Sequence, residues 1–232
     1  MSQKPVITIE DITNSALDER RSGLPKGSAT RGCEAGFTNL ETRIMDAENV
    51  DVAPNSFNAA LCRSALMHFS NPTKALAGVC RALKPSGKCS VTVYSTSEKN
   101  PFHGLPLSIA SRLAKIPLPA WGEPGMFALS GPGMLEECYQ KAGFRDVTVR
   151  AVPVQRHFPS TAEAVSAMKD YFPRLQTLLN KLSDAKRAQD WSEIEEGLSQ
   201  FEGVERIRGA RRVAYRSRDE VKPLLAVSPI AI

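Results

Sequence analysis

Two acidic residues stand where short apolar runs of this sequence end. Asp11 follows the β-branched run Val6–Ile9, and Asp46 follows a second candidate strand at Glu41–Met45. A carboxylate in such a position can accept several hydrogen bonds from a ligand. The alternatives are structural: Asp11 as the N-cap of a following helix, and Asp46 as part of a surface turn.

Two histidines are the candidate bases. His68 lies a few residues beyond the apolar run Phe57–Leu61, and His103 lies in a segment rich in proline and glycine. An imidazole can accept a proton from an O–H or N–H nucleophile. Packing or surface roles are the alternative for both. The sequence contains no Ser-His-Asp arrangement, phosphate-binding glycine loop or cluster of metal ligands, so no metal is expected.

Length and composition narrow the class of protein. The chain has 232 residues, of which 42% are hydrophobic and 24% charged. These values are typical of one globular domain, or a domain with an appendage, and exclude wholesale disorder. No run approaches the roughly 18 apolar residues of a membrane helix, and residues 1–10 do not resemble a signal peptide. A soluble, cytoplasmic protein with no membrane partner is expected.

The five cysteines indicate neither disulfides nor zinc, because they are odd in number and scattered without a C-x-x-C pair. They are Cys33, Cys62, Cys80, Cys89 and Cys138.

Positive charge is concentrated near the C-terminus. Residues 203–222 contain seven basic and three acidic residues, which is four of the net +5 charges of the chain. We expect residues 203–232 to form a basic, solvated C-terminal tail. A phosphate-contacting arm is the alternative, but few aromatic residues interrupt the basic run, so a nucleic-acid partner is not expected.

Strand and helix patterns alternate along the chain. Strands are predicted at 6–9, 41–45, 57–61, 89–94 and 144–154, and helices at 72–83, 132–142 and 162–201, the last with a break at Pro173. Alternation with short connections predicts an α/β fold with a mainly parallel sheet. In such sheets ligands bind at the carboxyl ends of the strands.

A segment at about 100–128 is too apolar for a free linker, and we interpret it as a lid inserted after the strand that ends at Tyr94. Phe102 and Trp121 lie within it. Together with Tyr94 they are the candidate substrate-binding residues, and their apolar character favours a hydrophobic small molecule. Ordinary core positions are the alternative.

Three segments resemble the class I S-adenosylmethionine-dependent methyltransferases, in the ubiquinone/menaquinone C-methyltransferase-like (type 11) branch. They are Asp46-Ala47-Glu48 with Asn55–Leu61, Arg81–Lys88 leading into Val91–Val93, and Ala142–Val147. The resemblance extends over roughly residues 5–202, which we take as one methyltransferase-like domain with a helical region at about 160–202. It implies a Rossmann-like methyltransferase sheet with a helical cap and C-terminal helices.

The resemblance also implies S-adenosyl-L-methionine as cofactor. In this family an acidic residue after the second strand binds the ribose hydroxyls, a position matched by Asp11 beside Ile12, with Glu10 as the alternate. An acidic residue after the third strand accepts from the adenine amino group and the next N–H meets the ring, which Asp46 and Ala47 match.

The fourth strand of the family passes the methionine end of the cofactor. Cys62 and Arg63 follow that strand in this sequence. For Cys62 a small core residue is an equal alternative.

Both ends of the chain depart from the family pattern. The opening strand and its glycine-rich turn have no counterpart, so the sheet should be N-terminally incomplete, with two strands lacking a partner. The segment after Gly203 does not look like a closing strand, because arginines at 211, 212, 216 and 218 interrupt the apolar alternation.

Four hypotheses remain. The first is methyl transfer to an apolar small molecule such as a quinone, polyketide or other secondary metabolite. The second is a degenerate, non-catalytic binding or partner protein, and the third is a nucleic-acid methyltransferase. The fourth is a truncated chain whose start lies upstream. The oligomeric state is not predicted.

Overall fold

Five strands form one sheet in the part of the chain that the computed structural model describes, which is residues 6–9, 36, 41, 43, 45–156, 158–200 and 207–217. The strands are β1 (Val6–Ile9), β2 (Phe57–Arg63), β3 (Leu83–Tyr94), β4 (Arg145–Arg156) and β5 (Ile207–Ser217). Their order across the sheet is β1-β2-β3-β5-β4. The first three are parallel, whereas β5 is antiparallel to both β3 and β4.

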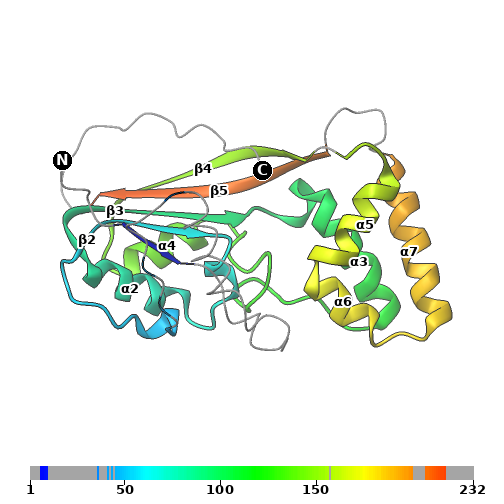
Figure 1. The fold of residues 1–232 in the computed structure, drawn as a ribbon, viewed down its shortest axis with the longest axis horizontal. Coiled ribbons are helices and arrows are strands. Elements are labelled where there is room, and N and C mark those ends of the chain that lie inside the picture. Colours follow the sequence, from blue (N-terminus) through cyan, green and yellow to red (C-terminus); the bar gives the residue numbers. More distant parts are fainter. Residues whose placement is uncertain are drawn as a thin grey trace.

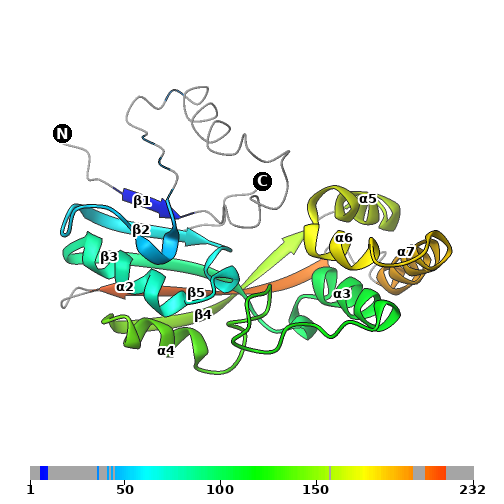
Figure 2. The same ribbon diagram turned by 90° about the horizontal axis from the view of Figure 1, so that it is seen from below.

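The helices fall into two groups (Figure 1). They are α2 (Pro72–Ala82), α3 (Pro101–Ala114), α4 (Met134–Lys141), α5 (Thr161–Tyr171), α6 (Pro173–Leu179) and α7 (Asp184–Ser199), with the 3-10 helices η3 (Ala47–Asn49), η4 (Leu66–His68) and η5 (Ser97–Lys99). Helices α2 and α4 cover one face of the sheet, and α3, α5, α6 and α7 form a helical unit beyond the end of β3 (Figures 1 and 2).

The β2–α2–β3 segment is the central parallel unit. Asn71 caps α2 by accepting from the N–H of Lys74 at 2.9 Å, and Pro72 follows at the first helical position, where its missing N–H costs nothing. The buried stripe of α2 includes Leu76 and Val79, which pack on the sheet. Because α2 runs back against the strands, its N-terminus lies on the side where β2 ends.

The described residues contain two hydrophobic cores that are in contact. The first lies between the sheet and helices α2 and α4, and the second lies inside the helical unit. Met126 and Phe127, in the loop between α3 and α4, pack against both cores. This loop therefore couples the helical unit to the sheet.

The predicted α/β architecture with parallel strands is confirmed, and so is the helix break at Pro173. Two expectations are corrected. The described residues Glu41, Arg43 and Met45 are not in a strand. Two strands were expected to lack a partner because the family's opening strand has no counterpart. In the structure β1 pairs directly with β2 from Val6↔Ala59 to Ile9↔Cys62, so the backbone groups of β2 are satisfied on that side.

The interpretation of the segment after Gly203 was wrong for residues 207–217. They form β5, which pairs with β3 from Ser90↔Tyr215 to Tyr94↔Arg211 and with β4 along almost its whole length. The ladder is made by backbone groups, so a strand with neighbours on both sides does not need an uninterrupted apolar alternation. The domain boundary at residue 202 remains a prediction.

Two helical glycines lead to a prediction about how closely α3 packs against its neighbours. A Cβ on Gly104 would lie 2.5 Å from the carbonyl oxygen of Ser97, whereas a Cβ on Gly197 would meet the Cδ2 atom of Leu105 at 2.8 Å. The first obstacle is backbone and the second is the end of a flexible side chain. Gly104→Ala should therefore lower the free energy of unfolding by about 1–3 kcal/mol in urea titrations.

Gly197→Ala is the matched control, because a gain of up to about 1 kcal/mol in helix propensity offsets its milder crowding. Equal losses of unfolding free energy in the two variants would show that α3 does not pack closely against the backbone of η5.

Candidate functional site

The parallel strands end together at one edge of the sheet, which we call the carboxyl edge. It is formed by the ends of β1, β2 and β3 at Ile9, Arg63 and Tyr94. Directly after β2 the chain turns sharply at Ser64, whose φ of 57° is in the left-handed region. The N–H of Ser64 donates to the carbonyl of Thr92 at 2.9 Å, which fixes this turn against β3.

Two buried hydroxyls at the carboxyl edge lack a hydrogen-bond partner among the described residues. They are Oγ of Ser64 and Oγ1 of Thr92. A buried polar atom without a partner costs free energy, and such atoms are rare in native folds. A polar ligand bound at the ends of the parallel strands would supply the missing hydrogen-bond partners of these two hydroxyls.

The 3-10 helix η3 begins with an aspartate cap. Asp46 accepts from the N–H of Glu48 at 2.9 Å through Oδ1 and from the side-chain amide of Asn49 through Oδ2. These hydrogen bonds, the backbone one first, lower the pKa of the exposed Asp46 carboxyl below its ordinary value. Asp46 is therefore a carboxylate at neutral pH, and the neighbouring Ala47 is half-buried against the core.

η3 is attached to the N-terminus of α2 by two long-range contacts. The N–H of Asn71 donates to Oε1 of Glu48 at 3.0 Å, and Nζ of Lys74 donates to Oδ1 of Asn49 at 2.6 Å. The N-terminus of α2 lies on the side where the parallel strands end. Asp46 is therefore held on the same side of the sheet as Ser64, although 18 residues separate them in the sequence.

An aromatic cluster lies where β3 enters the helical unit. Its members are Tyr94, Phe102, His103, Phe127, Phe158 and Phe172. The His103 ring is at its centre, with centroid distances of 4.8 Å to Tyr94, 5.0 Å to Phe102 and 5.3 Å to Phe172. His103 and Tyr94 are each 9% exposed, so the cluster is nearly closed to water.

Asn100 fixes the position of His103 relative to the sheet. Its buried side-chain amide donates to the Ser95 carbonyl at 3.2 Å, the Ser95 hydroxyl at 3.1 Å and the Thr96 carbonyl at 2.9 Å. It also stands immediately before α3, with Pro101 as the first helical residue. The side-chain amide of Asn100 therefore holds the turn between β3 and α3 in place.

The structure thus brings together three of the predicted site residues, Tyr94, Phe102 and His103. His68 is half-buried in η4, directly after the turn that follows β2. Trp121 is 60% exposed and makes no ring contact with the aromatic cluster among the described residues. Its loop is nevertheless attached to η4, since the N–H of Gly125 donates to the carbonyl of Met67 at 2.9 Å.

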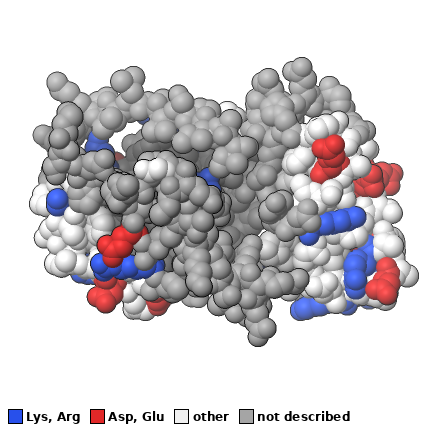
Figure 3. Space-filling view, in the orientation of Figure 1, with Lys and Arg blue, Asp and Glu red and all other residues white. Residues whose placement is uncertain are grey.

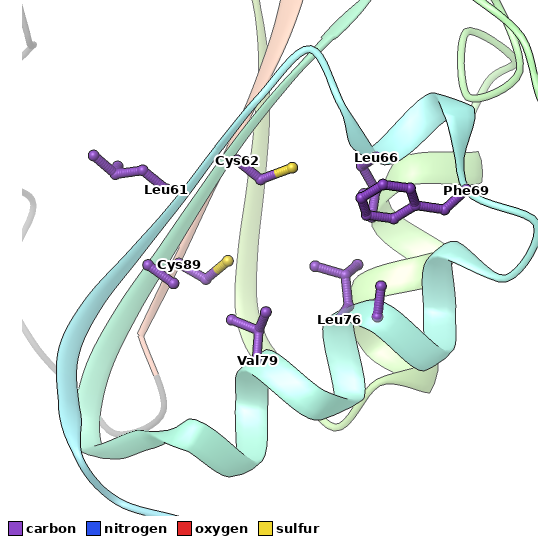
Figure 4. A pocket seen from close by; sticks show the side chains of 9 residues that line it. Leu61, Cys62, Leu66, Phe69, Leu76, Val79 and Cys89 are labelled. Carbon is purple, nitrogen blue, oxygen red and sulfur yellow. The ribbon is translucent and has the colours of Figure 1, made fainter. Parts of the chain in front are cut away.

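Cys62 points into the interior. It is 4% exposed and lines an apolar cavity of about 10 Å³ between the sheet and α2, together with Leu76, Val79 and Cys89 (Figure 4). A cavity of this size holds at most a single water. The core alternative is therefore favoured for the Cys62 side chain, whereas Arg63 is exposed on the opposite face of β2.

Asp11 and Ile12 lie outside the described residues, so their predicted role stays a prediction. The preceding strand β1 ends at the carboxyl edge, with Ile9 opposite Cys62. Ser64, Thr92 and Asn100 were missed from the sequence. Asn100 before Pro101 is a recognisable helix-start signal, but isolated hydroxyls on strand ends carry none.

The comparisons with known proteins agree with this geometry. Residues 11–91 match the model of the methyltransferase domain family. The sequence-based resemblance to S-adenosylmethionine-dependent methyltransferases is thereby confirmed, and the match supports S-adenosyl-L-methionine as the cofactor. Among curated proteins there was no significant match.

Solved structures share the fold at low sequence identity. A methyltransferase of Bacillus halodurans is 14% identical, with a TM-score of 0.55 over 95% of this chain and 94% of that one. The YcgJ protein of Bacillus subtilis is 18% identical, with a TM-score of 0.51 over 94% and 93%. These similarities show that the chain shares its α/β fold with both proteins.

A third structure is phosphoethanolamine N-methyltransferase 2 of Haemonchus contortus, in complex with phosphomonomethylethanolamine and S-adenosylhomocysteine. It is 19% identical with a TM-score of 0.41 over 76% of this chain, which spans 37% of the length of that protein.

Within the described residues, no helix is both long enough and apolar enough to span a bilayer. The same residues contain no group of three or more side chains placed to hold a metal ion.

Proposed function

We propose that this protein is an S-adenosylmethionine-dependent methyltransferase that acts on an apolar small molecule. The match of residues 11–91 to the methyltransferase domain carries the proposal. The placement of Asp46, Ser64 and Tyr94 on the strand-end side of the sheet supports it, because parallel α/β sheets bind ligands there.

The residues at the carboxyl edge suit the chemistry of a nucleoside cofactor. Asp46 is ionised, and each carboxylate oxygen has lone pairs beyond the one used within η3. Ala47 would present its backbone N–H to a ring edge. The hydroxyls of Ser64 and Thr92, which lack a partner among the described residues, would bond to polar groups at the other end. Asp11 and Ile12 would complete the nucleoside contacts.

When bound, the sulfonium of the cofactor supplies an activated methyl group. The chain needs to align a nucleophile with that group and to exclude water. His103 or His68 would accept the proton of an O–H or N–H nucleophile. The nearly closed aromatic cluster around His103 would keep water away from it.

The substrate side is apolar. Tyr94 and Phe102 surround His103 with aromatic surface, and Trp121 exposes an indole on the loop that is attached to η4. Planar or hydrophobic acceptors such as quinones, polyketides or other secondary metabolites fit this chemistry best.

One observation favours a second candidate, a non-catalytic relative that binds but does not methylate. Both oxygens of Asp46 already accept hydrogen bonds inside η3. A site weakened in this way could keep a binding role. Turnover of a substrate separates the two candidates.

A nucleic-acid substrate is not favoured. Four of the seven basic residues counted near the C-terminus, Arg208, Arg211, Arg212 and Arg216, belong to β5, which is a sheet strand and not a free arm. On the described surface of one face, acidic and basic side chains are interspersed over the helical unit (Figure 3).

The cofactor is tested by calorimetric titration of the folded protein with S-adenosylmethionine. Saturable binding is expected, and Asp46→Ala should weaken the affinity about tenfold or more, in line with the loss of one or two charge-assisted hydrogen bonds. Asp51→Ala, another exposed aspartate of the same segment, is the control and should bind normally. Absence of heat at high micromolar cofactor would count against the proposal.

The proposed base is tested with His103→Phe, which keeps an aromatic ring in the cluster but removes the proton acceptor. With an active acceptor from a panel of quinones and phenols, kcat should fall by about 10²–10⁴ while cofactor affinity stays unchanged. The same kcat measurement on His68→Gln shows which of the two histidines accepts the proton. Unchanged kcat in both variants would exclude a histidine base.

A further inference from the structure

Helix α7 carries a charged residue in its core stripe. Its buried residues are Asp190, Ile194 and Leu198, spaced four apart, so they lie on one face of the helix. Asp190 is 0% exposed, as deeply buried as Ile194. An apolar residue is the normal occupant of such a position, because burying a carboxylate without a partner is costly.

Neither oxygen of Asp190 has a hydrogen-bond partner among the described residues. One turn before it, Nε of Arg187 is also buried and has no partner in the described part of the chain, while its Nη2 reaches the Leu182 carbonyl and Asp184, each at 3.4 Å. The buried carboxyl is therefore not neutralised by a direct contact within its own helix.

The face of α7 that carries Asp190 packs against α3. Gly197 lies against Leu105 of α3, and Glu193 forms an ion pair with Arg112 of α3. Asp190 precedes Glu193 by three residues and Gly197 by seven, so it lies on this same face. It sits at the end of the interface farthest from His103.

The charged groups that face this part of α7 do not compensate the carboxylate. Arg112 of α3 is engaged with Glu193, which itself repels a negative charge at position 190. Lys169 of α5 stacks over the Trp191 ring, with Nζ 5.0 Å from its centroid. Burial first, and then Glu193, raise the pKa of Asp190 from 3.8 to about 6, with Arg112 acting in the opposite direction.

We propose that Asp190 makes the packing of α7 against α3 depend on pH. The protonated carboxyl is tolerated in the interface, and its ionisation loosens the contact between the two helices. Because Phe102 and His103 lie in the first turn of α3, looser packing would also free the aromatic cluster to open. The idea that this opening admits substrate rests on the proposed function, whereas the pH dependence of packing does not.

The direction of the effect follows from linkage. The folded state binds the Asp190 proton more tightly than the unfolded state, so this contribution to stability is fully present below about pH 4. It is lost progressively as the pH rises through about 6, which is the pKa of Asp190 in the folded state. Near neutral pH the folded protein carries the cost of a buried carboxylate.

The test compares Asp190→Asn with the wild-type chain by thermal unfolding between pH 4 and pH 8. The variant keeps the size of the side chain and removes its charge. Its unfolding midpoint should exceed that of the wild type by about 5 °C at pH 7.5, by about half as much at pH 5 and by little at pH 4, because a kcal/mol corresponds to a few degrees in a chain of this length. Glu195→Gln, an exposed acid on the same helix, should show no such pH-dependent difference.

Hydrogen exchange locates the effect. At pH 7.5 the amides of α3 and α7 should exchange about tenfold more slowly in Asp190→Asn than in the wild type, and nearly equally at pH 4. A midpoint difference that is constant across the range would overturn the proposal. If the variant fails to fold, carbon NMR titration of the wild-type aspartates decides: a carboxyl titrating near pH 6 supports it, and none above pH 5 refutes it.

Discussion

The parallel pairing of β1, β2 and β3 is the constraint on which the rest of the structure depends. Parallel strands that pair in register must end at one edge, and the chain must return between them through crossovers. Residues that follow β2 and β3 are therefore brought together whatever their separation in sequence. The turn at Ser64 and the end of β3 at Tyr94 meet for this reason, and α2, as the return crossover, carries η3 and Asp46 to the same side.

The second constraint is the attachment of the helical unit. It has its own core and is coupled to the sheet through the aromatic cluster, the Asn100 amide and the loop residues Met126 and Phe127. A unit attached at one end can move as a body more easily than elements that share a core. The carboxyl edge and the aromatic cluster share Tyr94, so polar groups and aromatic rings lie close together, which is an arrangement suited to a polar cofactor and an apolar acceptor.

Periodicity and turn chemistry predicted the elements whose stability is local. Helix α2 was found from Asn71, Pro72 and its apolar stripe, and β2 was found as a nearly continuous apolar run. The β5 strand could not be found, because its pairing with β3 and β4 depends on backbone groups far away in sequence and not on an apolar alternation of its own.

The candidate site was predictable to a similar extent. Asp46 was selected as an acidic residue after an expected strand at Glu41–Met45, although the described residues Glu41, Arg43 and Met45 are not in a strand. The apolar insertion indicated Phe102 and His103. Nothing in the sequence distinguished the buried hydroxyls of Ser64 and Thr92 from surface ones, since their burial results from tertiary packing. Asp190 looks like any polar residue of an exposed helix until its neighbours Ile194 and Leu198 are seen to face the core.

The central claim is that a cofactor binds along the carboxyl edge. Hydrogen–deuterium exchange of the folded chain with and without S-adenosylmethionine tests it most directly, because it reports where binding occurs without requiring a substrate. Slower exchange is predicted in residues 46–49, 64–68 and 94–96, with α4 and α7 unaffected. Unchanged exchange in those three segments at saturating cofactor, or protection confined to other parts of the chain, would contradict the account.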